Sequence, residues 1–148
     1  FTGLGAPYWD ANSRGVLSGI TRDTSSKEIV RATIEAVAYQ THDLFEAMKH
    51  DGLRPKIVKV DGGMVMNNWF SQFLSDVVNV KVLRPKVQET TALGAAFMAG
   101  LHIGVYKSLK DISRNWHVDK KFSPKMSKQL RSSLLKGWIK AIKRTLIN

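Results

Sequence analysis

Residues 56–78 constrain the fold more than any other part of the sequence, because they combine a strand pattern, a glycine turn and a helix pattern without interruption. Lys56 to Asp61 alternates apolar and polar residues, as a half-buried strand does. Asn68 to Val78 then repeats apolar residues at helical spacing, with Phe70, Phe73, Leu74 and Val77 on one face. A strand that leads directly into a helix is the repeating unit of α/β layer structures. We therefore expect an α/β fold with mainly parallel strands.

The rest of the chain continues this alternation. Ser25 and Glu28 form a capping-box pattern that predicts the start of a long helix, and Gly52 and Pro55 end its periodicity. Its expected apolar face carries Val30, Ile34, Val37, Thr41, Phe45 and Met48. The other elements expected are strands at Val16–Ile20 and Lys81–Leu83, and helices at Thr91–Ile103 and Ser127–Ile147.

Two further segments have a distinctive composition. The helix expected at 91–103 is rich in alanine and glycine, which predicts close approach of a neighbouring backbone. The opening residues have the glycine and proline content of a turn-rich segment. We expect them to form an ordered loop anchored by Phe1, Tyr8 and Trp9.

The charge of the chain is unevenly distributed. The net charge is +11, and residues 101–148 contain 12 Lys and Arg but only Asp111 and Asp119 as acids. The last helix pattern has Lys136, Lys140, Lys143 and Arg144 outside an apolar stripe made of Leu130, Leu134, Trp138, Ile142 and Leu146. Such a helix suits either docking onto the core or binding to nucleic acid or anionic lipid, and the docked helix is the expected role.

The absence of cysteine excludes disulfides and thiolate metal sites, and fits a reducing compartment such as the cytoplasm. The four histidines have no spacing typical of metal ligands, and we predict no metal site in this chain. The first residue is Phe1 rather than methionine, and three strands make a thin sheet. We therefore expect a piece of a longer polypeptide, with part of the sheet missing.

Asp61-Gly62-Gly63 lies where the strand at 56–61 ends and the chain turns towards the next helix. In open α/β sheets this edge is where ligands commonly bind, and adjacent glycines let a ring or phosphate approach the main chain. Asn67 would stand at the start of the helix, with an amide suited to nucleotide polar groups. The alternative is that the glycines only form a turn and Asn67 only caps the helix.

Three blocks in order carry a family resemblance: GVLSGITRDTSSKEIVRATIE (15–35), VDGGMVMNN (60–68) and ETTALGAAFMAG (89–100). Together they resemble the C-terminal domain of the FGGY carbohydrate kinases. The opening FTGLGAPYWDANSRG and the closing GWIKAIKR (137–144) resemble the members of that family that phosphorylate glycerol.

The resemblance implies an actin-like, ribonuclease-H-like ATPase domain. It divides the chain into a loop and strand (1–26), an α/β core (27–104), a loop (105–126) and a terminal amphipathic helix (127–148). It implies use of ATP or ADP with Mg²⁺, whose ligands are expected mainly outside this chain, and transfer of a phosphoryl group to glycerol.

The same resemblance places Gly62, Gly63 and Asn67 beside the nucleotide, with Met64 where the family usually has a smaller residue. It leaves no catalytic residue in this chain, since the catalytic aspartate and the glycerol site lie in the N-terminal portion of such kinases. The chain alone is therefore expected to be inactive. Another FGGY kinase with a pentose substrate, a non-enzymatic basic module, and self-association stay open as alternatives.

Overall fold

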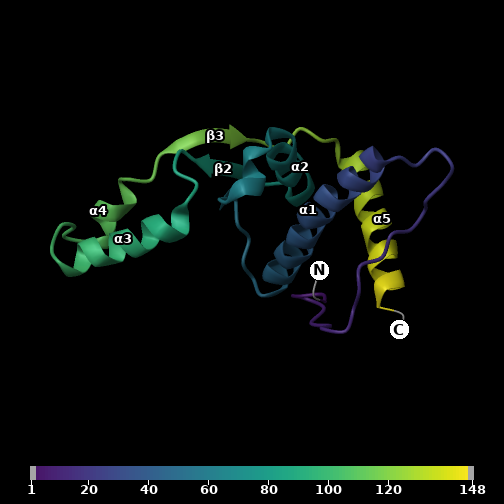
Figure 1. Ribbon diagram of the computed structural model, residues 1–148, viewed down its shortest axis with the longest axis horizontal. Helices are drawn as coiled ribbons and strands as arrows, with labels where there is room; N and C mark the ends of the chain where they lie inside the picture. The colour runs from purple at the N-terminus through teal and green to yellow at the C-terminus, as the bar shows by residue number, and fades with distance from the viewer. Residues whose placement is uncertain (1–2, 147–148) are drawn as a thin grey trace.

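The computed structural model describes residues 3–146, so Phe1 and the predicted helix end at Ile147 lie outside the described residues. Figure 1 shows a small sheet in the middle of the molecule, with three helices on one side and a two-helix arm extending from the other end. The elements are α1 (Ser26–His50), β1 (Ile57–Lys59), the 3-10 helix η1 (Gly63–Met66), α2 (Asn68–Val78), β2 (Lys81–Pro85), α3 (Thr90–His102), α4 (Leu109–Ser113), β3 (Val118–Phe122) and α5 (Lys128–Thr145).

The predicted helices at 68–78 and near 26–50 are confirmed, because local signals determine where both of them begin and end. The backbone N–H of Ser25 donates to the carboxylate of Glu28 at 2.8 Å, which completes the capping box of α1. The helix ends at His50, and Gly52 then adopts a positive φ of 84°. At the start of α2, Asn67 is the N-cap residue.

The core lies between α1, α2, α5 and the sheet. As predicted, Phe70, Phe73, Leu74 and Val77 of α2 are buried. Tyr39 of α1 joins the helices, because its ring stacks on Trp138 of α5 at 5.5 Å and meets Phe73 edge-on at 5.6 Å. Each aromatic pair of this kind contributes about 0.5–1.5 kcal/mol beyond the area it buries.

The sheet has the order β1-β2-β3. β1 pairs parallel with β2, as expected, but β3 pairs antiparallel with β2. The prediction that 105–126 is a loop was therefore wrong, since α4 and β3 both fall within it. β3 reads VDKKF, with only its two end residues apolar and three exposed charged residues between them. An edge strand of this composition lacks the alternation that predicts strands.

The strand predicted at Val16–Ile20 does not form in the described residues. The segment is irregular, and Val16, Leu17 and Ile20 are each more than half exposed. A strand needs a partner for its backbone N–H and C=O groups, and no strand of residues 3–146 pairs with this segment. Its apolar side chains consequently remain on the surface.

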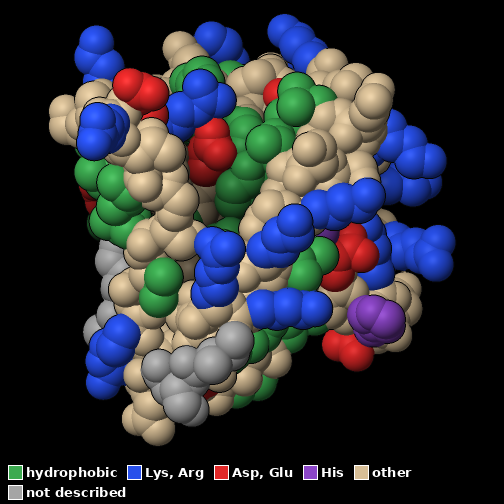
Figure 2. Space-filling view, turned by 90° about the vertical axis from the view of Figure 1, so that its right-hand side faces the viewer, with side chains coloured by type: hydrophobic (Ala, Val, Ile, Leu, Met, Phe, Trp, Pro, Cys, Tyr) green, Lys and Arg blue, Asp and Glu red, His purple; other side chains and the backbone are tan. Residues whose placement is uncertain are grey.

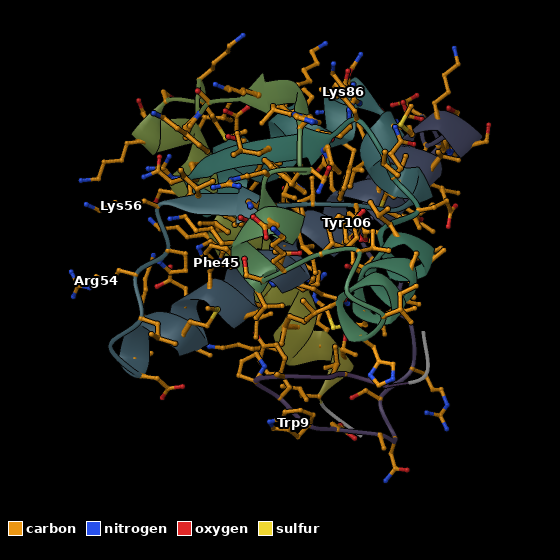
Figure 3. The ribbon with its side chains drawn as sticks, turned by 90° about the vertical axis from the view of Figure 1, so that its left-hand side faces the viewer. Trp9, Phe45, Arg54, Lys56, Lys86 and Tyr106 are labelled. Carbon is orange, nitrogen blue, oxygen red and sulfur yellow. The ribbon has the colours of Figure 1, made fainter. Side chains whose placement is uncertain are left out.

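Close packing occurs at Gly100 of the alanine- and glycine-rich helix, but against a side chain rather than against the neighbouring backbone that was predicted. A Cβ added to Gly100 would lie 2.9 Å from the ring of Tyr106, which Figure 3 shows near α3. Gly94, in contrast, has nothing within 4 Å of such a Cβ. α3 and α4 extend away from the core, so most of the small residues of α3 face solvent in this chain.

Three smaller expectations about apolar residues are also corrected. Val30 on α1 and Leu130 on α5 are more than half exposed, because each lies near the first turn of its helix, beyond the buried stripe. In the opening loop, Tyr8 is an anchor, since its hydroxyl donates to Asp43 at 2.9 Å. Trp9 is not an anchor: it is 79% exposed and lies at the periphery in Figure 3.

Candidate functional site

The glycine turn after β1 has a conformation that requires Gly62. This residue has φ 84° and ψ 174°, and it precedes η1 as its N-cap. Residues with a side chain rarely adopt that φ, so a glycine is needed here for the backbone alone. The expectation that the first glycine forms a turn with a positive φ is therefore confirmed for Gly62.

Gly63 is different, because neither its φ nor its packing requires a glycine. Its φ is not in the positive range, and a Cβ added to it would meet nothing within 4 Å. Gly62 is equally uncrowded. Two adjacent glycines therefore leave a patch of bare, exposed main chain at the end of β1. A flat ligand can lie close to such a surface, which a valine or leucine would obstruct.

Asn67 caps α2, as the alternative interpretation held. Its Oδ1 accepts hydrogen bonds from the backbone N–H groups of Trp69 at 2.9 Å and Phe70 at 3.3 Å. Capping uses only the oxygen of the amide. Within residues 3–146 its Nδ2 makes no hydrogen bond to protein, so two donors stay available on an exposed side chain next to the glycine turn.

Partly exposed apolar side chains follow the glycine turn in the sequence. Met64, Met66 and Trp69 are each between 41% and 49% exposed. Trp69 stacks on Phe73 at 5.0 Å, and the Arg31 guanidinium lies 5.2 Å from the centre of the Trp69 ring. Polarizable and aromatic surface of this kind suits contact with a heterocyclic ring.

Arg84 was missed by sequence reasoning, although its side chain donates hydrogen bonds to the backbone that follows the two glycines. It lies in β2, is only 7% exposed, and its Nη1 donates to the carbonyl oxygens of Val65 at 3.0 Å and Met66 at 3.2 Å. The same nitrogen donates to Oδ1 of Asn68 at 3.1 Å. A single arginine between apolar residues gives no sequence signal for such contacts, which join residues 16 to 19 positions apart.

Two larger cavities and a smaller one of about 120 Å³ lie near the surface, and none of the three includes the glycine turn. One of about 430 Å³ lies between the first turns of α1 and Trp69. The other, of about 510 Å³, lies between the opening loop, α1 and α5, and His42 and Asp43 are among its lining residues. Burial and a hydrogen bond to Asp43 raise the pKa of Tyr8, which also lines it, to about 12. We place the candidate site at the turn, because its open main chain and amide donors suit a nucleotide.

The basic residues of α5 lie on the surface. Lys136, Lys140, Lys143 and Arg144 are all exposed. Figure 2 shows Lys and Arg side chains spread over that end of the molecule, with fewer acidic ones among them. In the part of the chain that the structure describes, no helix has both the length and the apolar content needed to cross a membrane.

Comparison with known proteins gives the class first. The model of the C-terminal domain of the FGGY family of carbohydrate kinases matches residues 1–103. The chain therefore belongs to the FGGY family of carbohydrate kinases, and the family prediction is confirmed.

Within that family the chain is similar to glycerol kinases. It is 54% identical to glycerol kinase 1 of Pseudomonas aeruginosa over 144 residues, which is 97% of this chain and 29% of that protein. Glycerol kinase of Rhodospirillum rubrum is 52% identical over the same share of each chain. The chain thus spans less than a third of the length of these relatives.

Solved structures give the same picture. The structure of Plasmodium falciparum glycerol kinase with ADP matches with a TM-score of 0.85 and 37% identity, over 100% of this chain and 30% of that one. Xylulose kinase from Lactobacillus acidophilus matches with a TM-score of 0.73 and 26% identity, over 93% of this chain and 28% of that one. The predicted fold class, the α/β actin-like ATPase fold of the FGGY C-terminal domain, is confirmed.

Proposed function

We propose that this chain is the C-terminal, nucleotide-side part of an ATP-dependent glycerol kinase. The reaction is transfer of the γ-phosphoryl group of ATP to a terminal hydroxyl of glycerol, giving ADP and sn-glycerol 3-phosphate. The observation that carries the proposal is the 54% identity to a glycerol kinase over 97% of the chain. The 26% identity to a xylulose kinase of the same fold is far lower.

The glycine turn contributes the adenosine side of the cleft in this proposal. Gly62 and Gly63 provide main chain without nearby side chains, and Nδ2 of Asn67 provides donors for polar atoms of the nucleotide. The ADP in the structure of the Plasmodium falciparum enzyme supports nucleotide use by this kind of domain. The residues present therefore fit a nucleotide, which would supply the phosphoryl group.

The remaining machinery is proposed to lie in an N-terminal portion of the same kinase. Phosphoryl transfer depends on positioning and on neutralising charge across a closed cleft. Within residues 3–146 there is no group of three or more His, Asp or Glu residues that could hold a metal ion. The Mg²⁺ ligands are proposed to lie mainly in the N-terminal portion. By membership of this kinase family, the catalytic aspartate and the glycerol pocket are assigned to that portion as well, and the chain alone is proposed to be inactive.

The exposed segment at 16–20 fits this division of the enzyme. Val16, Leu17 and Ile20 form apolar surface on an irregular segment without a partner strand among the described residues. The N-terminal portion would cover this surface and complete the sheet. The kinase would act in the cytoplasm, in agreement with a chain that has no cysteine.

A second candidate is an FGGY kinase that phosphorylates a pentose. The structural similarity to a xylulose kinase, with a TM-score of 0.73, supports this candidate, because it shows that the C-terminal domains have the same fold. Because a common fold does not fix the substrate, the structural similarity alone does not separate the two candidates.

The experiment is a substrate panel on the complete kinase that contains this chain. ADP formation is measured with glycerol, xylulose and gluconate at equal concentrations, and the 148-residue chain is assayed alongside. We expect glycerol to give the highest kcat/KM and the chain alone to give no turnover. A preference for xylulose would support the second candidate, and glycerol phosphorylation by the isolated chain would refute the division into two portions.

A further inference from the structure

Arg84 is the buried cation beneath the candidate nucleotide site. Its side chain is 8% exposed, although arginine is rarely buried without compensating partners. The partners here come from two directions. On one side are the backbone carbonyls of Val65 and Met66 and the side-chain oxygen of Asn68. On the other side is the carboxylate of Asp119.

Asp119 holds the guanidinium in a fixed orientation. Its Oδ2 lies 2.7 Å from Nε and 2.7 Å from Nη2 of Arg84. Asp119 belongs to β3, the antiparallel edge strand, whereas Arg84 belongs to β2. Two donors engaged by one carboxylate leave Nη1 directed at the turn, because the guanidinium is planar and its donors have a fixed geometry.

Nη1 constrains only one end of the glycine turn. The carbonyl oxygen of Val65 accepts from Arg84 and also from the hydroxyl of Ser71 at 2.8 Å. Val65 and Ser71 are both buried. Gly62 and Gly63, at the other end, have nothing within 4 Å of an added Cβ. The turn is thus held firmly at residues 65–68 and left open at 62–63.

This arrangement links β3 to the surface of the site. Asn67 lies between Met66 and Asn68, two residues that Arg84 contacts, so the position of its amide follows from where the guanidinium holds its neighbours. Lysine could not make these contacts, because it offers one donor centre instead of a fork with five N–H groups. Asp119 pairs with the buried charge of Arg84, which offsets part of the cost of taking the guanidinium out of water.

We propose that Arg84, oriented by Asp119, is a positioning residue for nucleotide binding. It fixes the turn from Val65 to Asn68, and thereby the placement of Asn67, without touching the nucleotide itself. This inference rests on the proposed function, since it assumes that the nucleotide lies on the glycine turn. It predicts that ATP affinity depends on a side chain of β3 that is remote from the ligand.

The test uses Arg84→Met, Asp119→Asn and Asp119→Glu in the complete kinase. The KM for ATP, the KM for glycerol and amide hydrogen exchange of residues 62–70 are measured for each. We expect Arg84→Met to raise the KM for ATP by roughly tenfold or more, because small displacements of binding groups are costly, and to change the KM for glycerol by less than about twofold. Hydrogen exchange of residues 62–70 should become faster.

The Asp119 variants keep the test informative if Arg84→Met folds poorly. Asp119→Asn keeps the shape but loses the charge, so its effect on ATP should be in the same direction and smaller. Asp119→Glu retains a carboxylate, so its KM for ATP should stay closer to the wild-type value than that of Asp119→Asn. Arg131→Met is the matched control: Arg131 donates to Oδ1 of Asn79 at 2.8 Å, just beyond the far end of α2, and its loss should leave both KM values unchanged.

The outcomes separate this inference from the proposed function. Unchanged hydrogen exchange at 62–70 in Arg84→Met, or equal increases in both KM values, would overturn the positioning role. Gly63→Val, made in parallel, tests the site itself. If Gly63→Val leaves ATP affinity intact, the nucleotide lies elsewhere. The proposed effect of Arg84 on ATP binding is then refuted, even if Arg84→Met changes the amide hydrogen exchange of residues 62–70.

Discussion

Trp138 of α5 donates its indole N–H to Oδ2 of Asp43 on α1, at 2.6 Å. The hydroxyl of Tyr8 donates to the same oxygen at 2.9 Å. One carboxylate thus joins the opening loop, the first helix and the last helix. The C-terminal helix is docked on the core in this chain, as its apolar stripe predicts, and its Lys and Arg side chains lie on the outside.

Replacing Asp43 with alanine should destabilise this junction. The change leaves the N–H of Trp138 and the O–H of Tyr8 without their acceptor in a half-buried position, and each lost partner costs about 1–3 kcal/mol. We expect the free energy of unfolding of the complete kinase to fall by about 2 kcal/mol, measured by urea denaturation. Asp23→Ala, at an exposed position, is the control. A loss no greater than that of the control would show that the junction is unimportant.

Gly63→Val tests the nucleotide site by steric obstruction. The added side chain has open space around it, so the fold should tolerate it and the melting temperature should change little. We expect the KM for ATP to rise by roughly tenfold or more, because the bare main chain is lost. Gly137→Ala in α5, equally uncrowded, should leave the KM for ATP unchanged. Equal KM values for Gly63→Val and wild type would remove the site from this turn.

Substitution of Asn67 separates helix capping from nucleotide binding. Asn67→Asp keeps an oxygen for the N–H groups of Trp69 and Phe70 but removes the Nδ2 donors. We expect its stability to match wild type while its ATP affinity falls. Asn67→Ala should lose both, at a stability cost of about 1 kcal/mol. If Asn67→Asp binds ATP as wild type does, the residue is a cap only; calorimetric titration measures the affinity.

Gly100→Ala should loosen the α3 and α4 arm. The new methyl group would lie 2.9 Å from two atoms of the Tyr106 ring, which must move to avoid it. We expect faster hydrogen exchange in residues 100–113 and a stability loss of about 1–3 kcal/mol from overpacking. Gly94→Ala in the same helix meets no atoms and should stabilise it slightly. An unchanged exchange rate in Gly100→Ala would show that the ring adapts without cost.

The capping box of α1 should make stability depend on pH at the acid end. The Ser25 hydroxyl and backbone amides donate to Glu28 and hold its pKa below the ordinary value of 4.5. The native state therefore binds fewer protons than the unfolded state near that pH, so the stabilisation is complete above it and is lost as the pH falls through the lower, native pKa.

Glu28→Gln is the matching variant. It should lower the denaturant midpoint at about pH 6 and approach wild type once the pH is below the lowered native pKa, where Glu28 is protonated in both states. Glu46→Gln, which lies in the second half of α1 beyond the capping box, is the control. A wild-type advantage that persists unchanged in acid would contradict the role of the carboxylate.

The local structure around the candidate site was largely predictable, because its signals are local. A capping box within four residues started α1, and an asparagine beside its own helix capped α2. The adjacent glycines after a strand indicated an open turn, and Gly62 has the positive φ that explains its own presence. Interactions between residues three or four positions apart depend on neighbouring residues, so periodicity and capping patterns predict them.

Only the tertiary structure revealed what long-range contacts decide. β3 is a strand because β2 lies beside it, not because VDKKF favours one, whereas 16–20 has the composition of a strand and no partner within residues 3–146. Arg84 supports the glycine turn through bonds to residues 16 to 19 positions away and depends on Asp119, 35 positions away. Sequence alone determined where the chain turns and begins its helices, since neighbouring residues fix those choices. Pairing partners and buried charges were decided by which distant residues meet when the core closes.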